Sequence, residues 1–144
     1  MAVNECIPYY EAAYTQRLTV HVITTAFIGK RFVGPLTTFQ SGPGLAATAE
    51  GGNLQASGAP AAGGEVGGVA AWDQAVGKKG AVIRGAGTIV PVTSGAAITA
   101  GAELEVDNVG RVITATSGRV VGKAHNTVGA AGSDVQVELY GVGN

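Results

Sequence analysis

Hydrophobic and polar residues alternate along several short segments of the chain, and the first clear case is residues 18–24. Leu or Val occupies every second position there, and most of the remaining positions hold Thr, His or Ile. Because successive side chains of a strand point to opposite faces, this period of two predicts a β-strand. His21 is then expected on the same face as Thr19 and Ile23. A second short apolar segment, 31–33, follows after a glycine.

The alternation continues beyond Gly80 in short segments that Gly, Ser, Asn and Asp separate. In the sequence ELEVD at 103–107, Leu and Val alternate with Glu and Asp, which predicts one strand face in the core and one in water. We therefore expect the carboxylates of Glu103, Glu105 and Asp107 in solvent. Many short strands at even spacing favour an all-β fold, a small β-barrel or β-sandwich of the β-tulip type. The strands predicted in this part are 81–84, 88–92, 103–106, 111–114, 119–124 and 135–139.

The middle of the chain is rich in glycine, and residues 40–68 are predicted to be mostly loop with a short strand near 54–56. No segment supports a helix of more than two turns. A chain of 144 residues fits one domain better than two. We therefore predict an extended N-terminal arm at residues 1–16 and a single β domain at 17–144.

Two segments of the chain resemble each other faintly. The sequence GVAAW at 68–72, followed by a loop and GAVI at 80–83, is similar to GKAHN at 122–126, followed by a loop and SDVQV at 133–137. In a chain so rich in Gly, Ala and Val, such matches also arise by chance. An internal repeat and a chance similarity both remain open.

Charge and length exclude several classes of function. Nine basic and ten acidic residues give a net charge of −1, whereas binding to nucleic acid requires a basic face. No stretch reaches the ~18 apolar residues of a membrane span, and the start of the chain lacks the pattern of a signal peptide. We expect a soluble protein made in a cytoplasm, with neither nucleic acid nor membrane as partner.

Candidate catalytic chemistry is sparse. Cys6 could serve as a nucleophile with His21 or His125 as its base, but a lone cysteine also occurs as a small apolar residue. The two histidines lack the spacing of a metal site. The sequence GPGLAA at 42–47 matches a loose dinucleotide pattern without the helix that this pattern requires. We therefore predict no catalytic residues, no metal, no cofactor and no enzymatic activity.

Other residues carry two interpretations each. The carboxylates at 103–107 suit acid/base work or a hard cation, and a solvated strand face explains them as well. Trp72 is the only tryptophan of the chain. It is expected to fill the core, and a platform for stacking sugars is the alternative.

The arm is the remaining unusual feature, because it holds three of the four tyrosines of the chain. Tyrosine is a preferred anchor at protein interfaces, and an extended segment can wrap a partner or add a strand to a sheet. A frayed terminus is the alternative. The predicted contact residues on and beside the arm are Pro8, Tyr9, Tyr10, Tyr14 and Arg17.

The second half of the chain resembles the bacteriophage capsid decoration, or cement, proteins. The resemblance rests on VPVTSGAAITAGAEL at 90–104, VDNVGRV at 106–112, VGKA at 121–124 and VQVEL at 135–139. It extends over about residues 17–140 and is strongest in 81–140. These motifs consist mostly of turn glycines and strand valines, so they specify a fold more than a chemistry.

The resemblance implies a structural virion protein on the outer surface of the phage capsid, made in the host cytoplasm. Such proteins are typically trimers that join neighbouring major capsid subunits, and their N-terminal arms commonly reach onto the capsid protein. The major capsid protein and two further copies of this chain are the partners that follow. The alternative function is a β-sandwich module of a virion that binds carbohydrate or host through Trp72.

Overall fold

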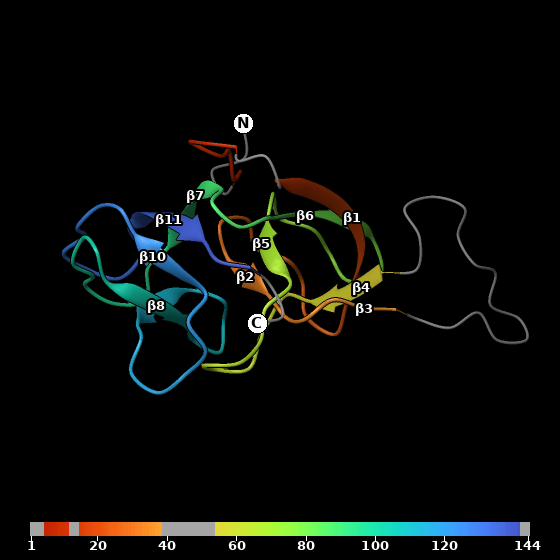
Figure 1. The fold of residues 1–144 in the computed structure, drawn as a ribbon. Helices are drawn as coiled ribbons and strands as arrows, with labels where there is room; N and C mark the ends of the chain where they lie inside the picture. Colours follow the sequence, from red (N-terminus) through yellow and green to blue (C-terminus); the bar gives the residue numbers. More distant parts are fainter. Residues whose placement is uncertain (1–4, 12–14, 39–53, 142–144) are drawn as a thin grey trace, which may run out of the picture.

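Short antiparallel strands form almost all of the regular structure in a computed structural model of the chain, which describes residues 5–11, 15–38 and 54–141 (Figure 1). The described residues contain no helix. Within these ranges, therefore, no helical segment has the length and hydropathy to cross a membrane. The strands are β1 Gln16–Ile23, β2 Phe32–Val33, β3 Thr37–Thr38, β4 Leu54–Ser57, β5 Gly68–Ala70, β6 Lys79–Arg84, β7 Ile89–Thr93, β8 Glu103–Val106, β9 Val112–Thr114, β10 Gly122–Ala124 and β11 Asp134–Leu139.

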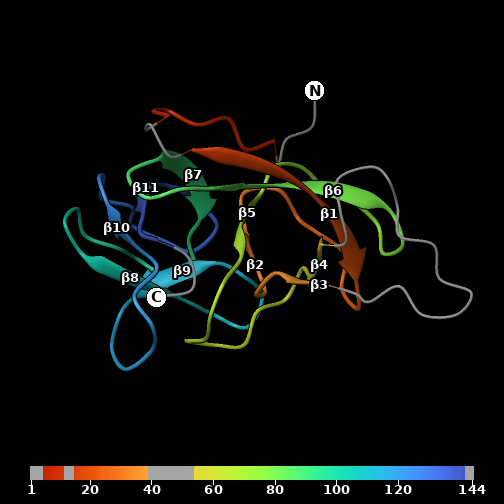
Figure 2. The ribbon, with the colours of Figure 1, turned by 45° about the vertical axis from the view of Figure 1, so that its right-hand side comes forward.

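The strands form two sheets that lie side by side (Figures 1 and 2). The first half of the chain forms the order β2-β5-β6-β1-β4-β3, and the second half forms β7-β11-β10-β8-β9. Each sheet curls, and a backbone hydrogen bond joins residues near its two ends. The N–H of Gly34 donates to Ser57 (2.8 Å) in the first sheet, and that of Gly95 donates to Val112 (2.8 Å) in the second. The all-β, barrel-like fold predicted from the alternation is confirmed.

Four strands of each sheet share one topology. The order β2-β5-β6-β1 in the first half corresponds to β8-β10-β11-β7 in the second, with antiparallel pairing throughout. One pair of corner loops in each half is joined by reciprocal backbone hydrogen bonds, Phe27 with Gln74 and Ile98 with Val128. The similarity between 68–83 and 122–137 is therefore an internal repeat, because these segments form β5–β6 and β10–β11.

One core holds the two halves together. The strands β2, β5 and β6 are buried on both faces. Their alternating side chains divide between a cluster within the first half and a larger cluster shared with the second half. Burial of each Val, Ile or Phe side chain stabilises the fold by about 1.5–3 kcal/mol. Val33, Ala70 and Val82 belong to the first cluster. Phe32, Val69 and Ile83 belong to the shared one.

Two predicted exposures are wrong. Glu105 is 7% exposed instead of lying in water, because the loop after β9 folds over its strand and the N–H groups of Thr116 (3.0 Å) and Gly118 (2.6 Å) donate to its carboxylate. These bonds, that of Thr116 first, lower the pKa of Glu105. Trp72 does not fill the core, since it is 41% exposed.

Candidate functional site

The described part of the arm, residues 5–11, lies along one side of the molecule above β7 (Figures 1 and 2). The N–H of Cys6 donates to Ala71 in the first half (2.7 Å). Farther along the arm, the N–H of Tyr9 donates to Ile89 of β7 (2.7 Å), and the N–H of Ile89 donates to Tyr10 (3.0 Å). The arm backbone is therefore fixed to both halves.

The arm covers the free edge of the second sheet, where β7 is the outermost strand. An exposed edge is a template for uncontrolled pairing. Ile89 is paired with the arm, Pro91 has no N–H and accepts a hydrogen bond from the thiol of Cys6 (3.6 Å), and the N–H of Thr93 donates to Lys30 (2.8 Å). This edge is therefore satisfied within the chain, and a partner must bind through side chains instead of adding a strand here.

Cys6 is a core residue and not a nucleophile. Its side chain is 2% exposed and belongs to the shared core cluster. Burial raises the pKa of the thiol to about 12, against a smaller opposing effect of Lys30 and Arg17. A thiol with this pKa carries almost no thiolate at neutral pH, so the interpretation as a small apolar residue is confirmed.

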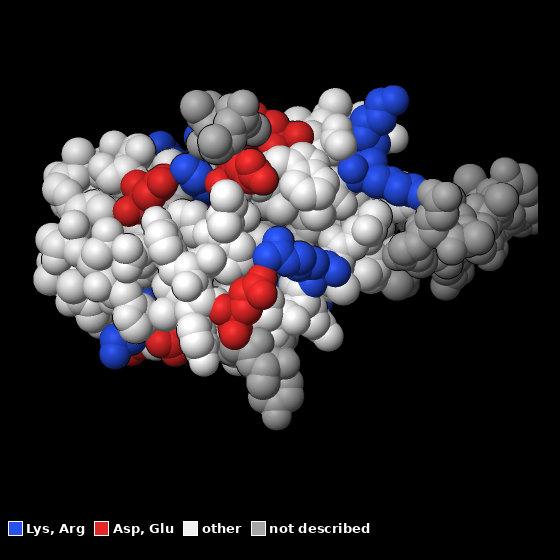
Figure 3. All heavy atoms as spheres, turned by 90° about the horizontal axis from the view of Figure 1, so that it is seen from above, with Lys and Arg blue, Asp and Glu red and all other residues white. Residues whose placement is uncertain are grey.

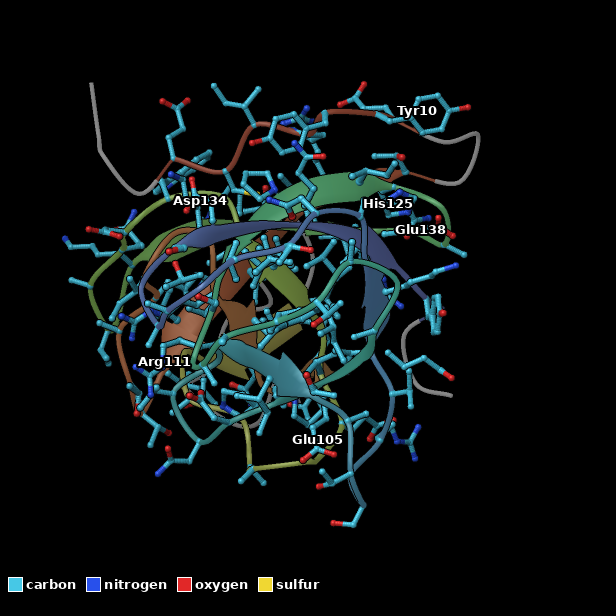
Figure 4. The ribbon with its side chains drawn as sticks, turned by 90° about the vertical axis from the view of Figure 1, so that its left-hand side faces the viewer. Tyr10, Glu105, Arg111, His125, Asp134 and Glu138 are labelled. Atoms are coloured by element: carbon cyan, nitrogen blue, oxygen red, sulfur yellow. The ribbon has the colours of Figure 1, made fainter. Side chains whose placement is uncertain are left out.

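The two histidines lie in ordinary strand surroundings. His21 is half-buried on β1, where it faces Lys79 across the sheet. The Nε2 atom of His125 lies 2.9 Å from the carboxylate of Glu138 on the neighbouring strand (Figure 4). Both side chains of this second pair are more than a third exposed. This is the geometry of a surface pair, which contributes little to stability.

The predicted contact residues differ in what they present. Tyr9 and Tyr10 are each 58% exposed although their backbone is fixed, and Tyr10 stands at the outer surface in Figure 4. Pro8, which precedes them in the chain, is half-buried. Arg17 is exposed and forms an ion pair with Glu11 of the arm. Tyr14 lies outside the described residues.

Sequence reasoning missed two exposed apolar residues on this side, Ile7 and Trp72. Ile7 is preceded by Cys6 and followed by proline, so no alternation marked its side chain as exposed. Trp72 lies between Ala71 and Asp73, and the expectation that it fills the core rests on the usual burial of a lone tryptophan. The hydrogen bond from the N–H of Cys6 to Ala71 brings the two segments together, and only the structure shows this contact.

Glu105 lies on the side of the molecule opposite Tyr10 (Figure 4). A hollow of about 430 Å³ is lined by Glu105 and Asp107. Asp107 accepts a hydrogen bond from the Nε of Arg111 (2.8 Å), and Glu105 is held by backbone N–H groups. Both carboxylates therefore support turns of the fold. Among the residues that the structure describes, no group of three or more His, Cys, Asp or Glu side chains could hold a metal ion.

The arrangement is that of a small β-barrel protein with a repeated strand order, and two exposed tyrosines lie on its arm. Comparison with known proteins defines the class further. The sequence pattern of the phage cement proteins matches residues 39–139, and the chain belongs to this family. It is thus a structural protein of the virion, located on the outer surface of the phage capsid.

A solved structure has the same fold. The N base of head fiber gp8.5 from bacteriophage phi29 is similar to this chain with a TM-score of 0.66, covering 87% of this chain and 93% of that chain at 17% sequence identity. Among curated proteins, none matches this chain.

Proposed function

We propose that this cement protein acts as a homotrimer that binds the major capsid protein and holds neighbouring capsid subunits together, without transforming a substrate. Residues 1–16 are its arm and 17–144 its β domain. The observation that carries the proposal is the pair Tyr9 and Tyr10, which are exposed on a backbone fixed at Ile89. Pro8 and Arg17 flank this pair, and the predicted contact at Tyr14 is part of the proposal.

The fixed backbone removes much of the cost of binding. Ordering a free segment costs about 2–5 kcal/mol at the moment of association. Hydrogen bonds at Cys6, Tyr9 and Tyr10 already position this part of the arm on the domain. Preorganised tyrosines therefore retain more of their contact energy for the capsid.

Trimerisation would strengthen a modest contact. Three arms on one trimer engage three equivalent sites of a symmetric lattice, so the second and third contacts form at a high effective concentration. Each contact then needs only the ~1,000 Å² of a specific interface. Holding several subunits at once is also what resists the separation of capsid subunits.

The test is a binding assay with expanded, undecorated capsids of the cognate phage. Wild type should bind in a fixed ratio to capsid subunits and raise the temperature at which the capsid breaks. The double variant Tyr9→Ala/Tyr10→Ala should lose at least about 30-fold in affinity, since truncation of an interface anchor costs about 2 kcal/mol or more. Val109→Ala, an exposed apolar residue of the second half, is the matched control and should bind normally.

Two results contradict the proposal. Wild type that fails to bind these capsids, at a pH and salt concentration where both are folded, refutes attachment to the capsid protein. A monomer in sedimentation equilibrium at the concentration of the assay refutes the homotrimer.

A further inference from the structure

Exposed apolar side chains are concentrated on one part of the described surface. Seven large apolar side chains are exposed, and only Val109 belongs to the second half. The other six lie on the arm or on the two corner loops of the first half, which the Phe27–Gln74 backbone bonds join. These six are Ile7, Tyr9, Tyr10, Ile28, Trp72 and Val76.

The second half provides an internal control for this corner. Both corners have the same backbone arrangement and the same type of side-chain bond. The N–H of Gly29 donates to the Asp73 carboxylate (2.9 Å) in the first, and the N–H of Ala100 donates to the Thr127 hydroxyl (3.0 Å) in the second. The fold of the corner therefore does not require large apolar residues at its surface.

Trp72 shows this most clearly. Its topological equivalent in the second half is Asn126, whose side chain accepts a hydrogen bond from the N–H of Gln136 (2.7 Å). An indole has no acceptor for such a bond. Trp72 instead exposes 41% of its surface. A large aromatic residue that the fold does not need, placed in solvent, is typical of a binding anchor.

Trp72 is continuous with the arm. The hydrogen bond from the N–H of Cys6 to Ala71 joins the two segments, and Ile7 and Trp72 each follow one of these bonded residues in the chain. Tyr9 comes two residues after Ile7, within about 7 Å along an extended chain. The arm and the corner thus form one surface that a single partner can cover.

This surface offers little net charge. Figure 3 looks down on the side where the arm lies, and acidic and basic side chains lie next to one another in the middle of this face. Glu11 and Arg17 form an ion pair there. The partner that fits is therefore an uncharged, apolar hollow that can receive an indole, and not a strongly acidic or basic patch.

We propose that Trp72, with Ile28 and Val76 on the same pair of joined corner loops, is a second anchor for the capsid surface, continuous with the tyrosines of the arm. This inference rests on the proposed function, because it takes the capsid as the occupant. Trp72 binds an apolar hollow of the capsid protein beside the site of the arm. A fully exposed tryptophan buries about 150–250 Å², and because Trp72 is 41% exposed, a partner that covers it removes on the order of 100 Å² from water.

The test compares Trp72→Asn, which copies the residue of the second half, with Val109→Asn in the same capsid-binding assay. Trp72→Asn should lower the affinity about tenfold or more and leave the melting temperature of the free protein nearly unchanged. Val76→Asn, on the same pair of corner loops, should lower the affinity about twofold to fivefold. Val109→Asn should change it less than twofold.

The outcomes separate this inference from the proposed function. Normal binding by Trp72→Asn, together with loss of binding by Tyr9→Ala/Tyr10→Ala, overturns the second anchor and leaves the arm contact standing. Loss of binding to a glycan array by Trp72→Asn, with capsid binding unchanged, assigns Trp72 to carbohydrate and also overturns it. A wild-type affinity that falls more than tenfold between 50 and 500 mM salt contradicts an uncharged contact, because ionic contacts weaken with salt in this way.

Discussion

The two halves of the molecule share a topology and differ in what they bury and expose. Four strands of each half match in order and in antiparallel pairing, and the joined corner loops are the same in both. The first half exposes large apolar residues at its corner, whereas the equivalent corner of the second half exposes small residues such as Ala and Gly. Strand pairing and a few close contacts therefore specify this barrel. The side chains exposed at the corner can vary without a change of fold, and so can be used for binding.

One close contact occurs in both halves. A Cβ atom added at Gly68 would lie 2.5 Å from the Val82 side chain and 2.6 Å from the Ile83 carbonyl oxygen. At the equivalent Gly122 it would lie 2.5 Å from the carbonyl oxygen of Glu138 and 2.7 Å from a neighbouring valine. Both halves therefore require glycine where the chain enters the strand beside β6 or β11.

Gly68→Ala should have the largest effect on stability. The added methyl group overpacks a buried site, which costs about 1–3 kcal/mol. The φ angle of 139° at Gly68 adds strain for any L residue. The free energy of unfolding should fall by about 3–5 kcal/mol for Gly68→Ala, and by about 1–3 kcal/mol for Gly122→Ala, which lacks the strained angle. Chemical denaturation measures both, and equal stabilities of the two variants would contradict this account.

The interiors of the halves are packed differently, which gives a second prediction. Phe27 fills the space above Gly80, where an added Cβ would lie 2.7 Å from the ring. The equivalent residues of the second half are Ile98 and Val135, both buried. Gly80→Val should therefore cost about 3 kcal/mol of stability. Adding Phe27→Ile should restore more than half of this loss, because the pair then copies the second half.

A double-mutant cycle checks this exchange. The coupling between Phe27→Ile and Gly80→Val should be favourable and exceed about 1 kcal/mol. Gly80→Val combined with Val109→Ala, which is remote, is the control and should show additive effects. Additive effects in both pairs would mean that Ile and Val cannot replace Phe27 and Gly80 as a pair, and would contradict this account.

Acid stability should depend on the second half more than on the first. The carboxylate of Glu105 has a lowered pKa, and Gly34 occupies the equivalent position of the first half. A lowered folded-state pKa gives stability that is complete above the unfolded-state pKa and is lost as the pH falls through the folded one. Glu105→Gln should lower the melting temperature at pH 7, and its difference from wild type should shrink below about pH 4.

The control for this prediction is Glu103→Gln, on the exposed position of the same strand. It should follow wild type at all pH values. A difference between Glu105→Gln and wild type that is independent of pH would show that the carboxylate charge does not hold the 116–118 loop.

The smallest expected effect is on the labelling rate of a thiol in the arm, a segment that has no counterpart in the second half. The thiol of Cys6 is buried, with its pKa raised to about 12. A thiol reagent at pH 8 should therefore label native protein only as fast as it unfolds, and label it at once in denaturant. Rapid labelling with an unchanged circular dichroism spectrum would show that the arm detaches while the barrels stay folded.

Much of the fold could be predicted from the sequence, because local pattern encodes it. The alternation at 18–24 and 103–106 identified β1 and β8, whereas the similarity of 68–83 to 122–137 left a repeat and a chance match open. The prediction failed at Glu105, where alternation puts a carboxylate outward and cannot show that a loop eleven residues later returns to bind it. It failed at Trp72 because hydrophobicity alone favours burial.

The candidate site could be predicted only in part. The three tyrosines marked the arm, and the exposure of Tyr9 and Tyr10 agrees with a contact surface. The chain gave no sign that Cys6 joins the core or that the arm passes Ala71. Those two facts place Trp72 beside the arm, and they depend on contacts between residues more than sixty positions apart.

The sequence by itself determined most of the β-strands, the turns between them and a net charge of −1, because these follow from the identity and spacing of apolar residues, glycines and charges within short segments. Only the tertiary structure decided which strand edge the arm covers, which carboxylate is buried and which aromatic residue stays in water. Burial is a property of the whole packed chain, and each of these residues owes its environment to segments that lie far away in sequence.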